Sequence, residues 1–345
     1  MEQVVPVYIL SGFLGSGKTT LLQRLLEHWK SQGLRPAVVM NELGEVNLDG
    51  LLVEQTVPMA ELLGGCICCS IRGDLSTELT TLVKKESPDV VIIEATGAAN
   101  PLEIVDGVTE TSLYLKVELR SLITVVDAAH ILELHRSQQG KTYRLMQEQI
   151  RCASVLILNK TDRVTAEEVE EVTGVLRKWN AFAPIMPTVR CELEPEELLS
   201  NSGGILSEGE YEVEEDVASE LLLDSGDPGS QQENGSVHAA HDHVMAYTHY
   251  FKRPVDSVEF EEFVQALPRD VYRAKGILTF SDTSSRFLFQ YAYREADYMK
   301  ITPQGEVPDV AVFIGEHFSS SELRKKLLQM EKRILVRPST VKRNL

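Results

Sequence analysis

Short apolar runs alternate with amphipathic stretches over the first half of the chain. The apolar runs, each long enough for one strand, lie at residues 4–10, 37–40, 90–93, 122–126 and 155–158. The stretches with helical periodicity lie at about residues 19–30, 74–85, 142–150 and 166–179. Strands that are apolar almost throughout are typical of parallel sheets covered on both faces. The alternation therefore predicts a doubly wound, mostly parallel α/β sheet.

A second folded region follows a change in composition. Residues 200–243 are rich in Gly, Ser, Glu, Asp and Gln, which predicts an acidic, His-containing flexible linker. Beyond it, strand patterns at 247–251, 274–280, 286–293 and 310–314 and helical patterns at 257–266 and 319–329 predict a small α+β domain. The expected division is a first domain at 1–199, the linker at 200–243, a C-terminal domain at 244–330 and a basic tail at 331–345.

The formal net charge of −18 is concentrated in one segment. Between Cys191 and His243 the chain has fifteen Asp and Glu residues and no Lys or Arg, so the folded regions carry little of it. The sequence has no basic patch of the kind that binds nucleic acid. It also lacks a run of the roughly 20 apolar residues that span a membrane, and its N-terminus lacks the basic region of a signal peptide. We therefore expect a cytoplasmic protein with neither nucleic acid nor membrane as partner.

A phosphate-binding loop lies between the first predicted strand and the first predicted helix. The segment 12–19 reads Gly-Phe-Leu-Gly-Ser-Gly-Lys-Thr, in which backbone N–H groups and a helix N-terminus can surround a phosphate. Lys18 is expected to contact the β- and γ-phosphates, and the hydroxyl of Thr19 to hold Mg²⁺. The expected nucleotide contacts in this segment are Gly12, Gly15, Ser16, Gly17, Lys18, Thr19 and Thr20.

The base of the nucleotide is indicated by Asn159-Lys160-Thr161-Asp162, directly after an apolar run. A carboxylate at the place of Asp162 can accept hydrogen bonds from N1–H and N2–H₂ of guanine, whereas adenine lacks the N2 donor. Buried polar groups left unpaired by the wrong base cost about 1–3 kcal/mol each. We therefore expect GTP to be preferred to ATP, with Asn159, Lys160 and Asp162 among the nucleotide contacts.

Glu94 and Gly97 follow the run at 90–93. A carboxylate at the end of a central strand can hold Mg²⁺ through water or orient an attacking water, and the N–H of Gly97 can contact the γ-phosphate. We predict Lys18 and Glu94 as the catalytic residues; the alternative for Glu94 is a solvated acid at a strand end. Asp127 ends the next predicted strand, and its role stays ambiguous.

Three of the five cysteines form the sequence Cys66-Ile67-Cys68-Cys69. Three thiolates with one open position suit a zinc site that exchanges its metal, because structural zinc sites are closed by four protein ligands. Copper(I) also suits soft thiolates. The competing hypothesis is redox chemistry between the adjacent Cys68 and Cys69.

Several residues could supply the fourth ligand of such a zinc site. Candidates are Glu42, Glu45, a histidine of the 238–243 segment, or a residue of a client protein. Cys152 is expected to begin a strand and to be a small core residue, as isolated cysteines commonly are.

Taken together, the segments 12–19, 41–46, 64–69, 94–97 and 159–162 resemble the motifs of the CobW-type GTPases, relatives of the HypB and UreG nickel-insertion proteins. Residues 251–314, with Arg273-Ala-Lys-Gly276, are similar to the C-terminal domain of that family. Two departures are Leu43 in place of the usual Phe, and a His-Asp-His run shortened to residues 238–243.

The resemblance implies a P-loop NTPase fold of the SIMIBI type and hydrolysis of GTP with Mg²⁺. It also implies delivery of zinc, held by Cys66, Cys68 and Cys69, to client metalloproteins, and it leaves a homodimer open. Two other functions stay open: a metal- or redox-sensing GTPase switch without metal transfer, and an insertion factor for cobalt or the cobalamin pathway.

Overall fold

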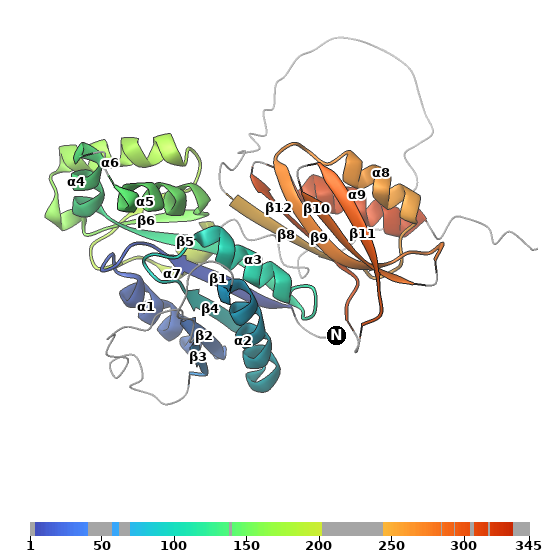
Figure 1. The fold of residues 1–345 in the computed structure, drawn as a ribbon. Coiled ribbons are helices and arrows are strands. Elements are labelled where there is room, and N and C mark those ends of the chain that lie inside the picture. The colour runs from blue at the N-terminus through green and yellow to red at the C-terminus, as the bar shows by residue number, and fades with distance from the viewer. Residues whose placement is uncertain are drawn as a thin grey trace, which may run out of the picture.

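The structure is a computed structural model that describes residues 4–40, 57–61, 70–137, 140–201, 244–283, 285–292, 294–303, 307–316 and 318–333. The cysteines at 66–69, Glu42, Glu45 and the histidines of the 238–243 segment lie outside these residues. Figure 1 shows two bodies side by side, one coloured blue to green and one orange to red.

The first domain is built on a parallel sheet of seven strands in the order β3-β2-β4-β1-β5-β6-β7. Its first elements are β1 (Val5–Ser11), α1 (Lys18–Ser31), β2 (Pro36–Met40), β3 (Met59–Glu61), α2 (Ser70–Glu86), β4 (Val90–Glu94), α3 (Pro101–Thr111) and β5 (Val117–Asp127). The remaining ones are α4 (Ala128–Ser137), α5 (Lys141–Cys152), β6 (Val155–Asn159), the 3-10 helix η2 (Thr161–Arg163), α6 (Ala166–Trp179), β7 (Ile185–Pro187) and α7 (Pro195–Asn201).

Alternate residues of the central strands enter two different apolar cores, one on each face of this sheet. Ile9 of β1 packs into the core beneath α2 to α6, whereas its neighbour Leu10 packs into the core beneath α1 and α7. All five residues of β2, β4 and β6 are buried. This two-sided burial explains the nearly continuous apolar runs in the sequence.

The C-terminal domain is an antiparallel sheet of five strands in the order β11-β10-β9-β12-β8, with two helices. Its elements are β8 (Val244–Tyr250), α8 (Ser257–Gln265), β9 (Val271–Thr279), β10 (Arg286–Ala292), β11 (Glu295–Ile301), β12 (Val310–Glu316) and α9 (Ser320–Arg333). Helices α8 and α9 cover one face, where Phe260 of α8 packs against Phe289 of β10, with ring centroids 5.0 Å apart. Leu327 of α9 and Phe313 of β12 belong to the same apolar core.

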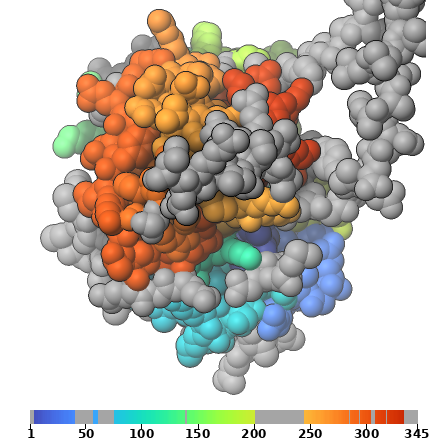
Figure 2. Space-filling view, turned by 90° about the vertical axis from the view of Figure 1, so that its right-hand side faces the viewer, coloured from blue at the N-terminus to red at the C-terminus, as the bar shows by residue number. Residues whose placement is uncertain are grey.

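The other face of this antiparallel sheet packs against the first domain. Along β12, Val310, Val312 and Ile314 belong to the core of the first domain, while Ala311 and Phe313 belong to the core under α8 and α9. The hydroxyl of Tyr250 lies 2.9 Å from the carbonyl oxygen of Leu115 and 2.9 Å from that of Val117. The two domains therefore share an apolar core, and Figure 2 shows the orange domain directly above the blue and cyan part of the first.

The predicted architecture is confirmed: a doubly wound parallel sheet and a smaller α+β domain. The sequence patterns missed α3 and α4 in the first domain and the edge strand β11 in the second. Strand β11 has mostly exposed side chains and so lacks an apolar alternation. Helix α3 had a usable signal, because Asn100 caps it and Pro101 occupies its first turn.

Cys152 is buried as expected, but it ends α5 instead of beginning a strand, because β6 starts only at Val155. Helix α7 reaches Asn201, and Leu198 within it is buried in the core beneath α1. The sequence patterns did not predict this helix because acidic residues surround its few apolar ones. Among the described residues, the helices are too short or too polar to cross a membrane.

Two glycines offer a matched test of packing. A Cβ at Gly276 of β9 would lie 2.3 Å from the carbonyl oxygen of Val310 and 2.3 Å from a ring carbon of Phe289, whereas a Cβ at Gly174 of α6 would have no atom within 4 Å. We expect Gly276→Ala to destabilise the C-terminal domain by about 1–3 kcal/mol through overpacking. Gly174→Ala should instead stabilise the first domain by about 0.5–1 kcal/mol. Chemical unfolding followed by circular dichroism compares the two midpoints, and a loss of stability only at Gly174 would contradict this packing.

Candidate functional site

The ends of four neighbouring strands bring the predicted nucleotide residues to one edge of the sheet. Leu10 of β1 pairs with Glu94 at the end of β4, and Asp127 of β5 pairs with Asn159 at the end of β6. In open α/β sheets, ligands bind outside the carboxyl ends of the strands. The parallel register therefore assembles one site from residues that lie far apart in the sequence.

The loop between β1 and α1 has the backbone of a phosphate cradle. Gly12, Gly15 and Gly17 all have positive φ angles, of 135°, 72° and 116°. A Cβ at Gly12 would lie 2.2 Å from the carbonyl oxygen of Val125, so the loop is held against β5. The loop leads directly into the N-terminus of α1, whose unpaired N–H groups and dipole favour an anion.

The side chain of Lys18 is buried inside this loop. Its Nζ donates hydrogen bonds to the carbonyl oxygens of Gly12, at 2.9 Å, and Phe13, at 3.3 Å. The hydroxyl of Ser16 is also buried and has no hydrogen-bond partner among the described residues. An ammonium group and an unpaired hydroxyl donor within a ring of backbone N–H groups fit the phosphates of a nucleotide.

Thr19 and Glu94 meet although 75 residues separate them: the hydroxyl of Thr19 donates to Oε1 of Glu94 at 3.0 Å. Glu94 is only 5% exposed, so its carboxylate faces the site instead of bulk solvent. A hydroxyl and a carboxylate are the hard oxygen ligands that Mg²⁺ prefers, usually completed by water and phosphate oxygens. The donor set therefore fits Mg²⁺, with Thr19 and Glu94 as the residues that would hold it.

Gly97 touches the phosphate loop. A Cβ at this position would lie 2.7 Å from the backbone nitrogen of Leu14, so only glycine allows the approach. The side chain of Gln149, buried on α5, donates from Nε2 to the carbonyl oxygens of Gly97, at 3.1 Å, and Ala99, at 3.5 Å. Sequence reasoning missed Gln149, whose only signal was a polar residue in a helical stretch.

Asn159 ties together two loops and is itself 2% exposed. Its Nδ2 donates to the carbonyl oxygen of Ser16 at 2.8 Å. Its Oδ1 accepts from the hydroxyl of Thr188 at 3.3 Å and from the backbone N–H of Cys191 at 3.0 Å. Asn159 thus acts as a brace beneath the phosphate loop, and the 188–191 loop is a part of the site that the sequence did not reveal.

Cys191 belongs to this brace as a packing residue. Its Sγ lies 3.5 Å from the carbonyl oxygen of Gly17, and burial raises the pKa of the thiol to about 11. A thiol with a raised pKa is a poor nucleophile and metal ligand at neutral pH. Burial likewise raises the pKa of the Cys152 thiol to about 12.

Lys160 and Asp127 form a second brace. Nζ of Lys160 lies 2.6 Å from the carbonyl oxygen of Gly15 and 2.6 Å from Oδ2 of Asp127. The other carboxylate oxygen of Asp127 accepts from the backbone N–H groups of Ala129 and His130 and so caps α4. Asp127, ambiguous in the sequence, is therefore a support for the phosphate loop.

Two predicted contacts are exposed. Asp162 lies on η2 just beyond Lys160, where its carboxylate is accessible to a base, and Thr20 lies in the first turn of α1.

The described residues contain no cluster of three His, Cys, Asp or Glu side chains that could hold a metal ion. Cys66, Cys68, Cys69 and Glu42 all lie outside them. His249 is a core residue of β8: its ring nitrogens lie 3.1 Å from the hydroxyl of Tyr247 and 3.3 Å from Oε2 of Glu331.

Comparison with known families gives two matches. Residues 6–187 match the family described as "CobW/HypB/UreG, nucleotide-binding domain". Residues 244–331 match the "Cobalamin synthesis protein cobW C-terminal domain". The first match covers the phosphate loop and the four strand ends described above but ends before the 188–191 loop. The second covers the antiparallel sheet with α8 and most of α9.

Individual relatives agree with these matches. The chain is 33% identical over 231 residues to the "Zinc-regulated GTPase metalloprotein activator 1" of Dictyostelium discoideum, covering 57% of this chain and 48% of that protein. It is 29% identical to the "Zinc chaperone YjiA" of Escherichia coli, covering 95% of this chain and 99% of that one. The crystal structure of zinc(II)-bound YjiA GTPase from E. coli is 24% identical, with the same coverage and a TM-score of 0.44. The chain spans about half the length of the Dictyostelium relative and of the "Zinc chaperone YeiR" of E. coli.

Asp127→Asn tests the brace at Lys160. Asparagine keeps an oxygen that can cap α4 but removes the charge that pairs with Lys160. We expect the affinity for GDP to fall about 5- to 30-fold, because a hydrogen bond between charged groups contributes roughly 1–2 kcal/mol when partly buried. Titration with a fluorescent GDP analogue measures the change.

The control is Arg136→Met, which removes exposed ion pairs between the last turn of α4 and Glu168 and Glu171 near the start of α6, none of which involves Asp127 or Lys160. It should change the affinity less than about twofold. Equal GDP affinity in Asp127→Asn and the wild type would show that the ion pair does not support the loop.

Proposed function

Because the chain belongs to the CobW/HypB/UreG family, we propose that it is a GTP-hydrolysing metallochaperone that binds zinc through Cys66, Cys68 and Cys69 and delivers it to client metalloproteins. The observation that carries the nucleotide half is the convergence of Lys18, Thr19 and Glu94 at the phosphate loop.

In the proposed reaction, GTP lies across the sheet edge with its phosphates in the 12–17 loop. Lys18 leaves the loop carbonyls and pairs with the β- and γ-phosphates, a charge-assisted contact stronger than the one it gives up. Thr19 and Glu94 hold the metal side of the site, where bound Mg²⁺ would neutralise charge on the phosphate oxygens. Glu94 also orients the attacking water, and the N–H of Gly97 contacts the γ-phosphate.

Guanine recognition is assigned to Asp162, supported by the η2 turn that follows Lys160. The backbone of the 188–191 loop stabilises this turn, because the carbonyl oxygen of Thr188 accepts from the N–H and the hydroxyl of Thr161, at 3.2 and 3.1 Å. Asn159 and Lys160 hold the base-binding loop and the phosphate loop in one arrangement.

Zinc is the proposed cargo. The names of the E. coli relatives YjiA and YeiR support zinc over cobalt or copper, and three neighbouring thiolates suit its coordination. Glu42 is one candidate for the fourth ligand, beside Glu45 and a histidine of the 238–243 segment. A site with three protein thiolates leaves a position through which a client ligand can enter, which closed four-cysteine sites lack.

Nucleotide and metal are coupled, in this proposal, through the sheet edge. The thiol cluster lies in the chain between Glu61, the end of β3, and Ser70, the start of α2. Glu61 at the end of β3 and Glu94 at the end of β4 both pair with Met40 of β2. The segment that contains the thiols therefore begins at the sheet edge where the nucleotide residues lie. Shifting a metal site from mostly loaded to mostly empty takes about 5.5 kcal/mol of differential binding, a magnitude within reach of GTP hydrolysis.

The partner is a metalloprotein that accepts zinc by ligand exchange. A cytoplasmic location and a homodimer formed around the metal belong to the same proposal, and size measurement with and without zinc addresses the dimer. A sensing switch without transfer is the competing function. GTP-dependent reactivation of a zinc-stripped metalloenzyme distinguishes them, since a sensor binds zinc without passing it on.

Single changes of Cys66, Cys68 and Cys69 to Ala test the zinc site. Each should lower zinc affinity at least about 10- to 100-fold, because each removes one of three thiolate ligands. Competition with a chromophoric chelator, in the presence of GDP and of a non-hydrolysable GTP analogue, measures the affinity in both states. Wild-type affinities that are equal in the two states would contradict the coupling.

The matched control is Cys152→Ala, which removes a buried thiol at the end of α5. It should leave zinc affinity within about twofold, because a buried thiol with a raised pKa supplies no thiolate. If Cys152→Ala lowered the affinity as much as Cys66→Ala, the assignment of the metal to the 66–69 turn would be wrong.

Asp162→Asn tests base recognition. The amide replaces one acceptor with a donor, so the N1–H and N2–H₂ groups of guanine can no longer both be satisfied. We expect GTP and GDP affinity to fall about 10- to 100-fold, which corresponds to roughly 1–3 kcal/mol. The weak affinity for ATP should not change, and an equal loss for ATP and GTP would indicate a damaged loop instead of lost base selection.

A further inference from the structure

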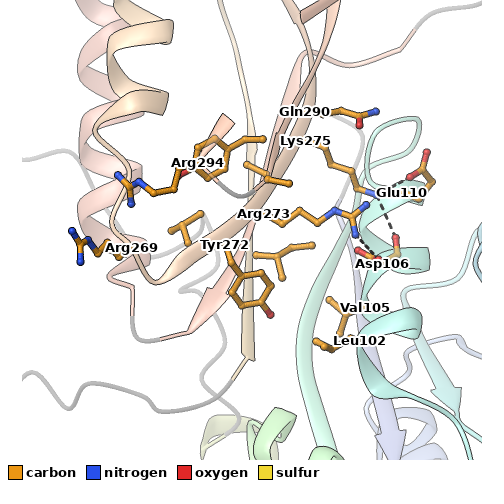
Figure 3. A pocket seen from close by; sticks show the side chains of 15 residues that line it. Leu102, Val105, Asp106, Glu110, Arg269, Tyr272, Arg273, Lys275, Gln290 and Arg294 are labelled. Atoms are coloured by element: carbon orange, nitrogen blue, oxygen red, sulfur yellow. Dashed lines mark hydrogen bonds and ion pairs between the residues drawn. The ribbon is translucent and has the colours of Figure 1, made fainter. Parts of the chain in front are cut away.

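Helix α3 lies between the nucleotide residues and the C-terminal domain. It begins at Pro101, four residues after Gly97, and its middle faces strand β9 across a cleft of about 690 Å³. The cleft is lined by Asp106 and Glu110 of α3 and by Arg273 and Lys275 of β9. Figure 3 shows the two basic side chains pointing from the strand toward the helix.

Two ion pairs cross this cleft. Nη1 of Arg273 lies 2.6 Å from Oδ2 of Asp106, and Nζ of Lys275 lies 2.7 Å from Oε2 of Glu110. Nζ of Lys275 also lies 3.4 Å from the backbone carbonyl oxygen of Asp106. Strand β9 of the C-terminal domain therefore binds two acidic side chains of α3 and one of its backbone carbonyl groups.

Lys275 is more deeply buried than most lysines, because its side chain is only 5% exposed. Burial lowers the pKa of Lys275, and the carboxylate of Glu110 opposes this shift. Buried charged groups are costly unless a partner compensates them, so Lys275 needs α3 close by. The helix cannot move away from β9 without leaving that ammonium uncompensated.

The start of α3 is held just as firmly at the nucleotide site. Gln149 binds the carbonyl oxygens of Gly97 and Ala99, and Asn100 accepts from the N–H of Leu102 as the helix cap. Gly97 packs against the backbone of Leu14 in the phosphate loop. The chain from Glu94 to Glu110 is thus one braced unit with the nucleotide residues at its first end and the ion pairs at its second.

From this continuity we propose that Arg273 and Lys275 are positioning residues for GTP hydrolysis: they hold α3 and, through it, set Glu94 and Gly97 against the γ-phosphate. The inference rests on the proposed function. It also assigns a role to the Arg-Ala-Lys-Gly sequence at 273–276, which nothing in the nucleotide site uses. A shift of α3 between the GTP-bound and GDP-bound states would reach the C-terminal domain through the same two ion pairs.

A defined kinetic signature follows from the geometry. In the proposed function Lys18 and Asp162 bind nucleotide, and Asn159 braces the phosphate loop, without a contact to α3, so loosening the helix should leave GDP affinity unchanged. Glu94 and Gly97 act on the γ-phosphate and the water, where a displaced donor or carboxylate lowers the rate of the chemical step. The loss should therefore appear in kcat and in the preference for a GTP analogue over GDP.

The experiment uses full-length Lys275→Met, which keeps the buried stem and leaves the partly exposed Glu110 to water. We expect kcat for GTP hydrolysis to fall about five- to tenfold, with KM and the Kd of GDP within about twofold of the wild type. Glu110→Gln, on the other side of the cleft, should likewise lower kcat and leave KM and the Kd of GDP unchanged. It replaces Lys275→Met in the experiment if that variant does not fold. The double variant should lose no more than either single one, because both act through one contact.

The matched control is Arg286→Met, which removes an ion pair with Asp309 inside the C-terminal domain, away from α3. It should leave kcat and KM within about twofold even if the melting temperature falls. An unchanged kcat in Lys275→Met and Glu110→Gln would overturn the proposal. An equal fall of kcat in Arg286→Met would overturn it too, since general destabilisation would then explain the effect.

Failure of the proposed function is separable from failure of this inference. If the wild type binds GTP but does not hydrolyse it, the function is wrong. The inference is then decided by the ratio of the Kd of GDP to that of a non-hydrolysable GTP analogue. That ratio should fall about five- to tenfold in Lys275→Met if α3 positions Gly97, and an unchanged ratio would refute it.

Discussion

Burial of the central strands on both faces is the constraint on which the rest of this protein depends. Because β1, β4, β5 and β6 have apolar cores on either side, polar groups can be used only where the strands end. The parallel register places those ends side by side, so that Leu10 lies opposite Glu94 and Asp127 lies opposite Asn159. The chemistry of the site is therefore concentrated along one edge of the sheet.

At that edge, much of the polar structure supports the phosphate loop from below. Asn159 and Lys160 bind its backbone carbonyl groups, Asp127 holds Lys160, and the buried Gln149 holds the Gly97 turn. Such bonds fix the direction of backbone N–H groups before any ligand arrives. Preorganised dipoles of this kind stabilise charge without the cost of reorienting during reaction.

The C-terminal domain is joined to this edge by more than a linker. Strand β12 contributes alternate side chains to two cores, so part of the apolar interior of the first domain is supplied by the second. Polar contacts at Tyr250, Arg273 and Lys275 then set where the antiparallel sheet sits relative to α3 and β5. An interface with an apolar core and partly buried ion pairs favours transmission of small shifts, because tightly packed surfaces have few intermediate arrangements.

The sequence by itself determined the alternation of the central strands with α1, α2, α5 and α6, the phosphate loop at 12–19 and the strand-end positions of Glu94 and Asn159. These are local features, set by apolar periodicity and by the residues that follow each strand. Only the tertiary structure decided that Gln149 binds the Gly97 turn, that the 188–191 loop braces Asn159 and that Lys275 meets Glu110. Each of those contacts joins residues at least 29 positions apart, and strand register and domain packing choose the partner, which no local pattern records.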